Sequence, residues 1–432
     1  AQEQKSQVLS LDDFTHYFSN TKILLLILFI ATLIVYFNSF NVPFYLDDYP
    51  SIVENTAIHD ITEPEKIWGF YFPRFVGYLS FALNYSLGGI STFGYHIVNF
   101  LIHFLAGISV FYLTRLLIAA ASKDKSQSFP PLYLYTIPFV AALIFLINPQ
   151  QTQAVTYIVQ RLSSMAALFY LTALISYSYA RLHQKPALFL VTLVFAGLAF
   201  FTKQNTATLP LAMVLIEVTF FQPPGKIQWK KLLLIALPVL AVFGFAAFYF
   251  FDLPLEKLDA ITRTSHTEFL TRGQYFATQS LVVWHYIRQF FFPLDLHLDY
   301  DFPIQQSLIS VKVFIALAGH IGILLFAYII RKKQPVVFFA ISFYYLAHLV
   351  ESSVIPITDV VFEHRTYLPN MGISMLVAMG FYLLVQQQNL KKIALVLLVL
   401  LILWFSYLTI ARNAVWTDQI KFYQNETKYL SL

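Results

Sequence analysis

The chain has 432 residues, a formal net charge of +5 and no cysteine, so disulfides and cysteine-ligated metals are excluded. Hydrophobic residues make up 58% and charged residues only 12%, about half the charged fraction of a soluble globular protein. The small positive excess favours lysines and arginines that face anionic membrane lipids over nucleic-acid binding. We therefore predict an all-α polytopic membrane protein.

A membrane-spanning helix needs about 20 apolar residues, and by that measure we predict eleven spans. If the N-terminal segment, 1–21, is cytoplasmic, lysine and arginine gather in each inner loop, as the positive-inside rule requires. The long loops 42–94 and 252–310 and the C-terminal segment 412–432 then lie outside. We expect the first span to be retained, because neither a basic n-region nor a small-residue cleavage site precedes it. The predicted spans are 22–41, 95–121, 134–149, 155–181, 187–203, 206–221, 231–251, 311–330, 335–350, 371–387 and 391–411.

Both long outer loops carry aromatic and aliphatic residues at helical spacing, over 66–89 and 268–296. Such patterns predict amphipathic helices that lie in the membrane interface. After the last span, Arg412 and Trp416 are predicted to anchor the chain at the interface.

Ionisable side chains recur at the predicted outer ends of several spans. Asp47 and Asp48 are the first of them, directly after the first span. A desolvated charge costs several kcal/mol unless it is paired, so a structural bundle has no need for so many at one depth. We expect them to converge on one cavity. The others are His96, Arg161, Lys203, Glu351, Glu363, His364 and Arg365.

Six short segments follow one another with consistent sidedness between about residues 40 and 420. They are YLDD (45–48), PR with LSFALNYSLGG (73–89), GYH (94–96), NPQQTQAVTYIVQR (148–161), TKQNTATLP (202–210) and VFEHRTYLP (361–369). Together they resemble the transmembrane O-mannosyltransferase family related to the animal cadherin-targeting enzymes. The resemblance implies the GT-C fold, in which residues 22–411 would form the catalytic domain.

The chain departs from the family pattern at several positions. Members typically have His-Pro where this chain has Asn148-Pro149, and Thr-Glu-Ala-Val where it has Thr-Gln-Ala-Val at 152–155. They have Lys-Glu where it has Lys203-Gln204. Because glutamine is not a base, we assign Gln153 and Gln204 no acid/base role. The tetratricopeptide repeats that usually follow the last span of family members are not expected in this sequence.

The resemblance implies that an acceptor hydroxyl attacks a sugar linked to a polyprenyl phosphate, with inversion at the anomeric carbon. A positioned base is worth roughly 100-fold to 10,000-fold in such a step, and by the family pattern Asp47 is that base. Asp48 would orient Asp47, hold the acceptor or contact a metal, which leaves a divalent cation open as a cofactor. Alternatively, the pair only caps or orients the loop.

The leaving phosphate needs cations, and the guanidinium fork matches phosphate oxygens. Arg365 is the first choice, with His364 beside it and Glu363 as an orienting partner. Arg161 and Lys203 are further phosphate candidates, although charges at span ends also extend toward lipid headgroups. His96 and His103 are seven residues apart on one helical face, and both are also candidates for purely structural histidines. Contacts with the sugar or the acceptor are expected from Arg74, His96, Arg272, Gln279, Asp299 and Glu351.

We predict an inverting glycosyltransferase that moves a hexose, mannose by resemblance, from a polyprenyl-phosphate donor to a Ser or Thr hydroxyl of an exported protein. The active site would face the non-cytoplasmic side of a bacterial inner membrane or, less favoured, an ER-type membrane. Alternatives are a glycan or glycolipid acceptor, oligosaccharide transfer from a lipid pyrophosphate, a transporter or flippase for a lipid-linked substrate, and a noncatalytic scaffold. The long outer loops could also bind a partner subunit of a larger complex.

Overall fold

The computed structural model describes residues 20–123, 129–222, 228, 230, 233, 237, 241, 270–357 and 359–427. These residues form helices and no strand, which confirms the all-α prediction. The α-helices are α2 (Thr21–Tyr36), α3 (Pro64–Tyr71), α4 (Phe75–Gly88), α5 (Thr92–Lys123), α6 (Tyr133–Ile147), α7 (Thr152–Thr156), α8 (Arg161–His183), α9 (Leu188–Phe200), α10 (Leu209–Ile216), α13 (Arg272–Phe291), α14 (Val311–Ile330), α15 (Pro335–His348), α16 (Asn370–Val385), α17 (Lys391–Trp416) and α18 (Gln419–Thr427).

Five helices in the described part of the chain are long and apolar enough to cross a membrane, or six if one bent pair counts as a single span. Helices α9, α15 and α16 are shorter apolar helices. Each predicted span coincides with helical residues except 231–251, which lies almost wholly outside the described residues. A polytopic helical membrane protein is therefore confirmed, but the predicted number of eleven spans is not.

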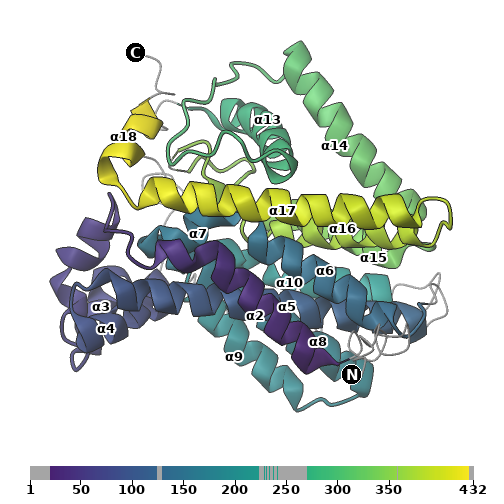
Figure 1. Ribbon diagram of the computed structural model, residues 1–432, viewed down its shortest axis with the longest axis horizontal. Coiled ribbons are helices and arrows are strands. Elements are labelled where there is room, and N and C mark those ends of the chain that lie inside the picture. Colours follow the sequence, from purple (N-terminus) through teal and green to yellow (C-terminus); the bar gives the residue numbers. More distant parts are fainter. Residues whose placement is uncertain are drawn as a thin grey trace, which may run out of the picture.

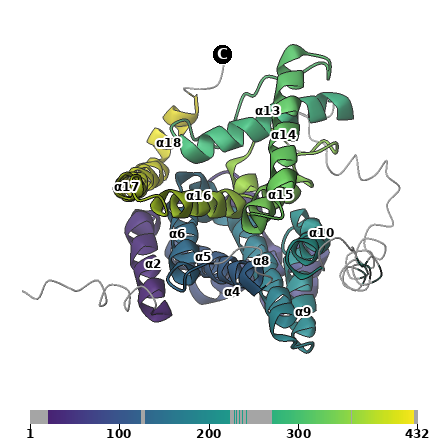
Figure 2. The same ribbon diagram turned by 90° about the vertical axis from the view of Figure 1, so that its right-hand side faces the viewer.

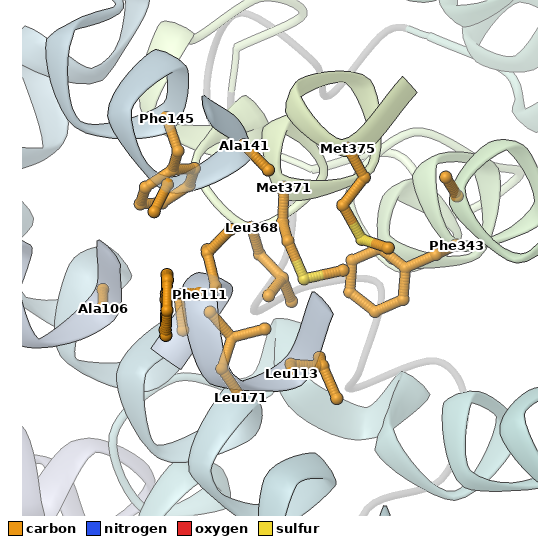
Figure 3. Close-up of a cluster of buried hydrophobic side chains, with 14 of the residues drawn as sticks. Ala106, Phe111, Leu113, Ala141, Phe145, Leu171, Phe343, Leu368, Met371 and Met375 are labelled. Carbon is orange, nitrogen blue, oxygen red and sulfur yellow. The ribbon is translucent and has the colours of Figure 1, made fainter. Parts of the chain in front are cut away.

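The central helices α5, α6, α8, α15 and α16 pack around one apolar core. Figure 3 shows Phe145 of α6, Phe343 of α15 and Met371 of α16 in this core. Because lipid tails are as apolar as these side chains, close approach of small residues matters more in a membrane than burial itself. A Cβ atom on Gly372 of α16 would lie 2.6 Å from the Ala340 carbonyl oxygen of α15, so this crossing requires glycine.

The predicted third and fourth spans do not meet in a simple loop. Between α6 and α8 the chain forms the short helices η5 (Pro149–Gln151), α7 and η6 (Ile158–Gln160), and the chain direction bends by 56° after α6. Proline cannot donate a helical hydrogen bond, and it forces the preceding residue out of the helical region; Asn148 is accordingly extended. The spans predicted at 134–149 and 155–181 therefore ran too far into this segment.

Helices α2 and α17 run toward the same end of the molecule, where α3, α4 and α18 lie (Figure 1). Helices α13 and α14 cover one side of the bundle in both views (Figures 1 and 2). The helices predicted in both outer loops are present, as α3 with α4 and as α13. However, α13 buries polar as well as apolar residues, among them Gln279 and Gln289, so it is packed into the protein rather than lying with one face in lipid.

Candidate functional site

Asp48 is fully buried, and both of its carboxylate oxygens accept hydrogen bonds from the backbone. Oδ2 accepts the N–H of Tyr45 at 2.9 Å, and Oδ1 accepts the N–H of Val159 at 2.7 Å. Burial raises the pKa of Asp48 to about 8, although these hydrogen bonds and the charge of Arg161 oppose the rise. Both oxygens of Asp48 therefore hold backbone groups, one within its own loop and one at Val159.

Asp47, in contrast, is exposed. Its backbone N–H donates to the hydroxyl of Tyr157 at 2.8 Å. The preceding residue, Leu46, has a φ of 34°, in the left-handed region that L side chains rarely adopt. Strain of this kind persists only where surrounding contacts impose it, and it is concentrated at functional sites. The loop therefore turns one acid of the pair inward and presents the other.

Tyr157 and Trp416 hold this loop; sequence reasoning did not single out Tyr157 and gave Trp416 a different role. The Tyr157 ring stacks on Trp416 with centroids 5.6 Å apart, and the Tyr45 hydroxyl donates to the Trp416 carbonyl at 2.6 Å. Trp416 is fully buried, and Arg412 is buried and pairs with Glu426 at 3.7 Å. The prediction that Arg412 and Trp416 are interface anchors was therefore wrong. Nothing local in the sequence indicates these partners, which come from distant segments.

A second cluster joins residues from four segments. The Lys203 ammonium contacts the Glu351 carboxylate at 2.9 Å and donates to the Ser163 hydroxyl at 2.9 Å. The Asn205 side chain donates to the other Glu351 oxygen at 3.1 Å. Because Lys203 and Glu351 are both buried, Lys203 does not extend toward lipid headgroups.

Arg365 and His364, in the short helix η9 (Glu363–Thr366), belong to the same cluster. Arg365 Nη1 donates to the carbonyls of Asp359 and Val360 at 2.9 and 3.3 Å, and the Gln279 side chain donates to the latter carbonyl at 2.8 Å. Burial, and then the charges of Lys203, Arg365 and Arg74, lower the pKa of His364 well below its ordinary value of 6.5. The structure therefore gathers six of the predicted residues: Arg74, Lys203, Gln279, Glu351, His364 and Arg365.

The segment between α6 and α8 connects the two clusters. Tyr157 and Val159 contact the Asp47–Asp48 pair, and Ser163, in the first turn of α8 that follows, contacts Lys203. The Gln153 side-chain oxygen accepts the backbone N–H of His364 at 2.6 Å. Gln153 therefore has a positioning role, which is consistent with the decision to assign it no acid/base chemistry.

Arg161 is fully buried, and each of its three nitrogens donates to the protein. Nε donates to Asn99 Oδ1 at 2.6 Å, Nη1 to the Ser80 carbonyl at 3.2 Å, and Nη2 to the Tyr95 carbonyl at 3.0 Å. These bonds brace α8 against α4 and α5. The expectation that Arg161 binds the lipid phosphate does not fit, because the side chain is fully buried and each of its nitrogens already donates to the protein.

Three other predicted contacts lie outside both clusters. His96 is buried in α5, and its Nε2 bonds to the Val42 carbonyl at 2.8 Å, which is the structural role considered for it. Arg272 is exposed in the first turn of α13, and Asp299 is exposed in the following loop, where its N–H donates to Glu426 at 3.5 Å. Among the described residues, no group of three or more His, Asp or Glu side chains is placed to hold a metal.

Glu363 points away from Arg365, contrary to the predicted orienting role. Its Oε1 accepts the His297 N–H at 2.7 Å and the Tyr300 hydroxyl, and it is fully buried. These bonds tie η9 to the loop after α13. Burial raises the pKa of Glu363 to about 7, with the charge of Arg412 opposing the rise.

The pKa of Glu363 predicts a stability change with pH. Below about pH 4.5 the folded and unfolded states both hold the proton, but between pH 4.5 and 7 only the folded state does, so stability falls as the pH rises through this window. Each unit of pKa difference is worth about 1.4 kcal/mol. We expect Glu363→Gln, which resembles the protonated acid, to unfold at a temperature that changes less between pH 5 and 8 than that of the wild type. Equal slopes in thermal unfolding would contradict this assignment.

The fold and its two clusters define a helical membrane protein with an exposed carboxylate and a buried cationic cluster, both in contact with the segment between α6 and α8. The chain is 24% identical to protein O-mannosyl-transferase TMTC3 of Mus musculus over 91% of this chain and 46% of the relative. It is 26% identical to protein O-mannosyl-transferase F38B6.6 of Caenorhabditis elegans over 93% of this chain and 57% of the relative. A third relative, protein O-mannosyl-transferase Tmtc3 of Drosophila melanogaster, is 31% identical over 34% of this chain and 18% of its own.

These similarities confirm the resemblance to the transmembrane O-mannosyltransferase family, and the relatives' names agree with the predicted class of glycosyltransferase. The chain spans about half the length of the curated relatives that it matches over most of its own. No family model and no solved structure matches it.

Proposed function

We propose that this chain is an inverting glycosyltransferase that moves mannose from a polyprenyl phosphate to a Ser or Thr hydroxyl of an exported protein. The observation that carries the proposal is the exposed Asp47, held by buried partners on a segment that also contacts His364 of the cationic cluster. The names of the relatives support mannose and a protein acceptor. We place the reaction on the non-cytoplasmic face of the membrane, because of the distribution of lysine and arginine.

In the proposed step, the Asp47 carboxylate takes the proton of the acceptor hydroxyl while the hydroxyl oxygen bonds to the anomeric carbon. The bond between that carbon and the phosphate oxygen breaks, and the electron pair leaves with the lipid phosphate. Attack from the side opposite the phosphate inverts the anomeric configuration. Asp47 suits the role of base because its carboxylate is exposed, whereas the oxygens of Asp48 are bound to the backbone.

The cationic cluster suits the leaving phosphate. It holds three cations, Arg74, Lys203 and Arg365, and the carboxylates of Glu351 and Asp359 both act on Arg365, which leaves one positive charge in surplus. The phosphodiester of the donor carries one negative charge, and its departure as a monoester adds a second. Preorganised cations in a desolvated site stabilise charge that develops in the transition state.

The direct test uses the purified chain in lipid nanodiscs, with polyprenyl-phosphate mannose as donor and a Ser/Thr-rich peptide as acceptor. We expect mass spectrometry to detect one added hexose per modified residue, and NMR of the glycopeptide to show inversion. Parallel reactions with GDP-mannose as donor, with a glycan acceptor and with EDTA examine donor, acceptor and cation requirement. Movement of the lipid donor across proteoliposomes without transfer would refute the proposal in favour of a flippase.

A further inference from the structure

Helix α15 carries a buried polar stripe that the proposed reaction does not use. Tyr344 and His348 are one turn apart and only 3% and 2% exposed, and Ser352 follows one turn later. Within the described residues, the Tyr344 hydroxyl, both ring nitrogens of His348 and the Ser352 hydroxyl have no hydrogen-bond partner. Native proteins rarely leave buried polar atoms unpaired, so this group on α15 and just after it indicates a bound polar group.

The stripe adjoins the cationic cluster from inside the bundle. The His348 ring lies parallel to the Tyr286 ring at 5.5 Å, and the Tyr344 ring meets His348 edge-on at 4.8 Å. The Tyr286 hydroxyl accepts the backbone N–H of Phe362, three residues before Arg365. Glu351, the partner of Lys203, follows His348 by three residues. Tyr344 is therefore one helical turn further along α15 from Glu351 than His348 is.

We propose that Tyr344 and His348 bind the phosphate oxygens of the lipid donor, as neutral hydrogen-bond donors on the bundle side of Arg365. This inference rests on the proposed function, since it concerns the same donor. A lipid phosphate offers several acceptor oxygens, and those that face the bundle lie away from the side chains of the cationic cluster. A neutral hydroxyl and imidazole N–H add donors without adding charge deep in the bundle, where a further cation would be costly.

The position on α15 favours the phosphate over the sugar as the bound group. The sugar must reach Asp47 at the end of the molecule, whereas the polyprenyl tail must lie alongside apolar helices. The phosphate joins these two parts, and the stripe lies between the cationic cluster and the apolar part of α15. We therefore expect the cationic cluster to bind the phosphate oxygens on one side, and the Tyr344 hydroxyl and the His348 imidazole to bind them on the bundle side.

The test measures binding of farnesyl phosphate to the purified full chain, with farnesol as the probe that lacks the phosphate. We expect Tyr344→Phe and His348→Phe each to weaken farnesyl phosphate binding by about 2- to 13-fold, the range of one hydrogen bond, and to leave farnesol binding unchanged. The matched control is Tyr170→Phe, a buried core tyrosine whose hydroxyl pairs with Thr208 at 3.2 Å. This control should bind farnesyl phosphate like the wild type.

Thermal unfolding supplies a second readout. Because the Tyr344 hydroxyl is buried and unpaired, its removal should leave the unfolding temperature unchanged or raise it, whereas Tyr170→Phe should lower it. Unchanged phosphate affinity in both α15 variants, or an equal loss of farnesol affinity, would overturn the proposal. Phosphate binding that depends on Tyr344 and His348 in a protein that transfers no mannose would support this inference and reject the proposed function instead.

Discussion

Replacing Asp47 with asparagine should abolish most sugar transfer, with a fall in kcat of about 100-fold to 10,000-fold, the usual contribution of a general base. The amide keeps the shape of the side chain but cannot take the acceptor proton. The fold should persist, because the contact that positions Asp47 is made by its backbone N–H and the Tyr157 hydroxyl. Single-turnover transfer from polyprenyl-phosphate mannose, measured together with thermal unfolding, checks both parts.

Asp48→Asn is the matched control for Asp47→Asn. Its amide nitrogen would face a backbone N–H of either Tyr45 or Val159, because the carboxylate accepts both. We therefore expect the unfolding temperature and transfer to fall together in Asp48→Asn, but only transfer to fall in Asp47→Asn. Full activity of purified Asp47→Asn would show that another group is the base.

Replacing Arg365 with glutamine should lower kcat/KM for the lipid donor by about 100-fold to 1,000-fold, as expected for loss of a preorganised group that stabilises transition-state charge. Arg365 is buried with Lys203 in the cationic cluster, so solvent cannot replace its charge. Arg365→Lys should retain part of the activity, because it keeps the charge but loses the fork. Initial rates at varied donor concentration measure the effect.

Arg331→Gln provides the control for Arg365→Gln. The Arg331 guanidinium lies over the Tyr328 ring, as that of Arg365 lies over Phe362, but Arg331 follows α14 in a predicted cytoplasmic loop. The Arg331→Gln variant should have the same kcat/KM for the lipid donor as the wild type. If Arg365→Gln and Arg365→Lys both match the wild type in donor kcat/KM, the phosphate does not bind Arg365.

The helices were predictable because hydrophobic spacing is a local property. Spans such as 311–330 and 335–350 match α14 and α15 closely, since long apolar runs have few alternatives to a helix in a membrane. The break after α6 was harder to place. Pro149 marks it, but the polar residues that follow lie inside an otherwise apolar run, and their burial depends on partners elsewhere in the chain.

The site was predictable in part. Lys203, Glu351 and Arg365 were recognised as charges at span ends, and the structure brings them together. Arg161 and Glu363 have the same sequence signature but different surroundings. The donors of Arg161 are bound to α4 and α5, and Glu363 is bound to the loop after α13. The sequence shows that a charged residue lies at the end of a span, but it does not show which side chain or backbone group that residue contacts.

The sequence by itself determined that the chain is a helical membrane protein, and it identified the acid pair with the cations that accompany it. Apolar runs and charge positions are local, and they suffice for that conclusion. Only the tertiary structure decided that Asp48 turns inward and Asp47 outward, because the backbone donor that holds Asp48 Oδ1 belongs to Val159, far along the chain. Hydrogen bonds between distant segments give two adjacent, identical residues different environments and therefore different roles.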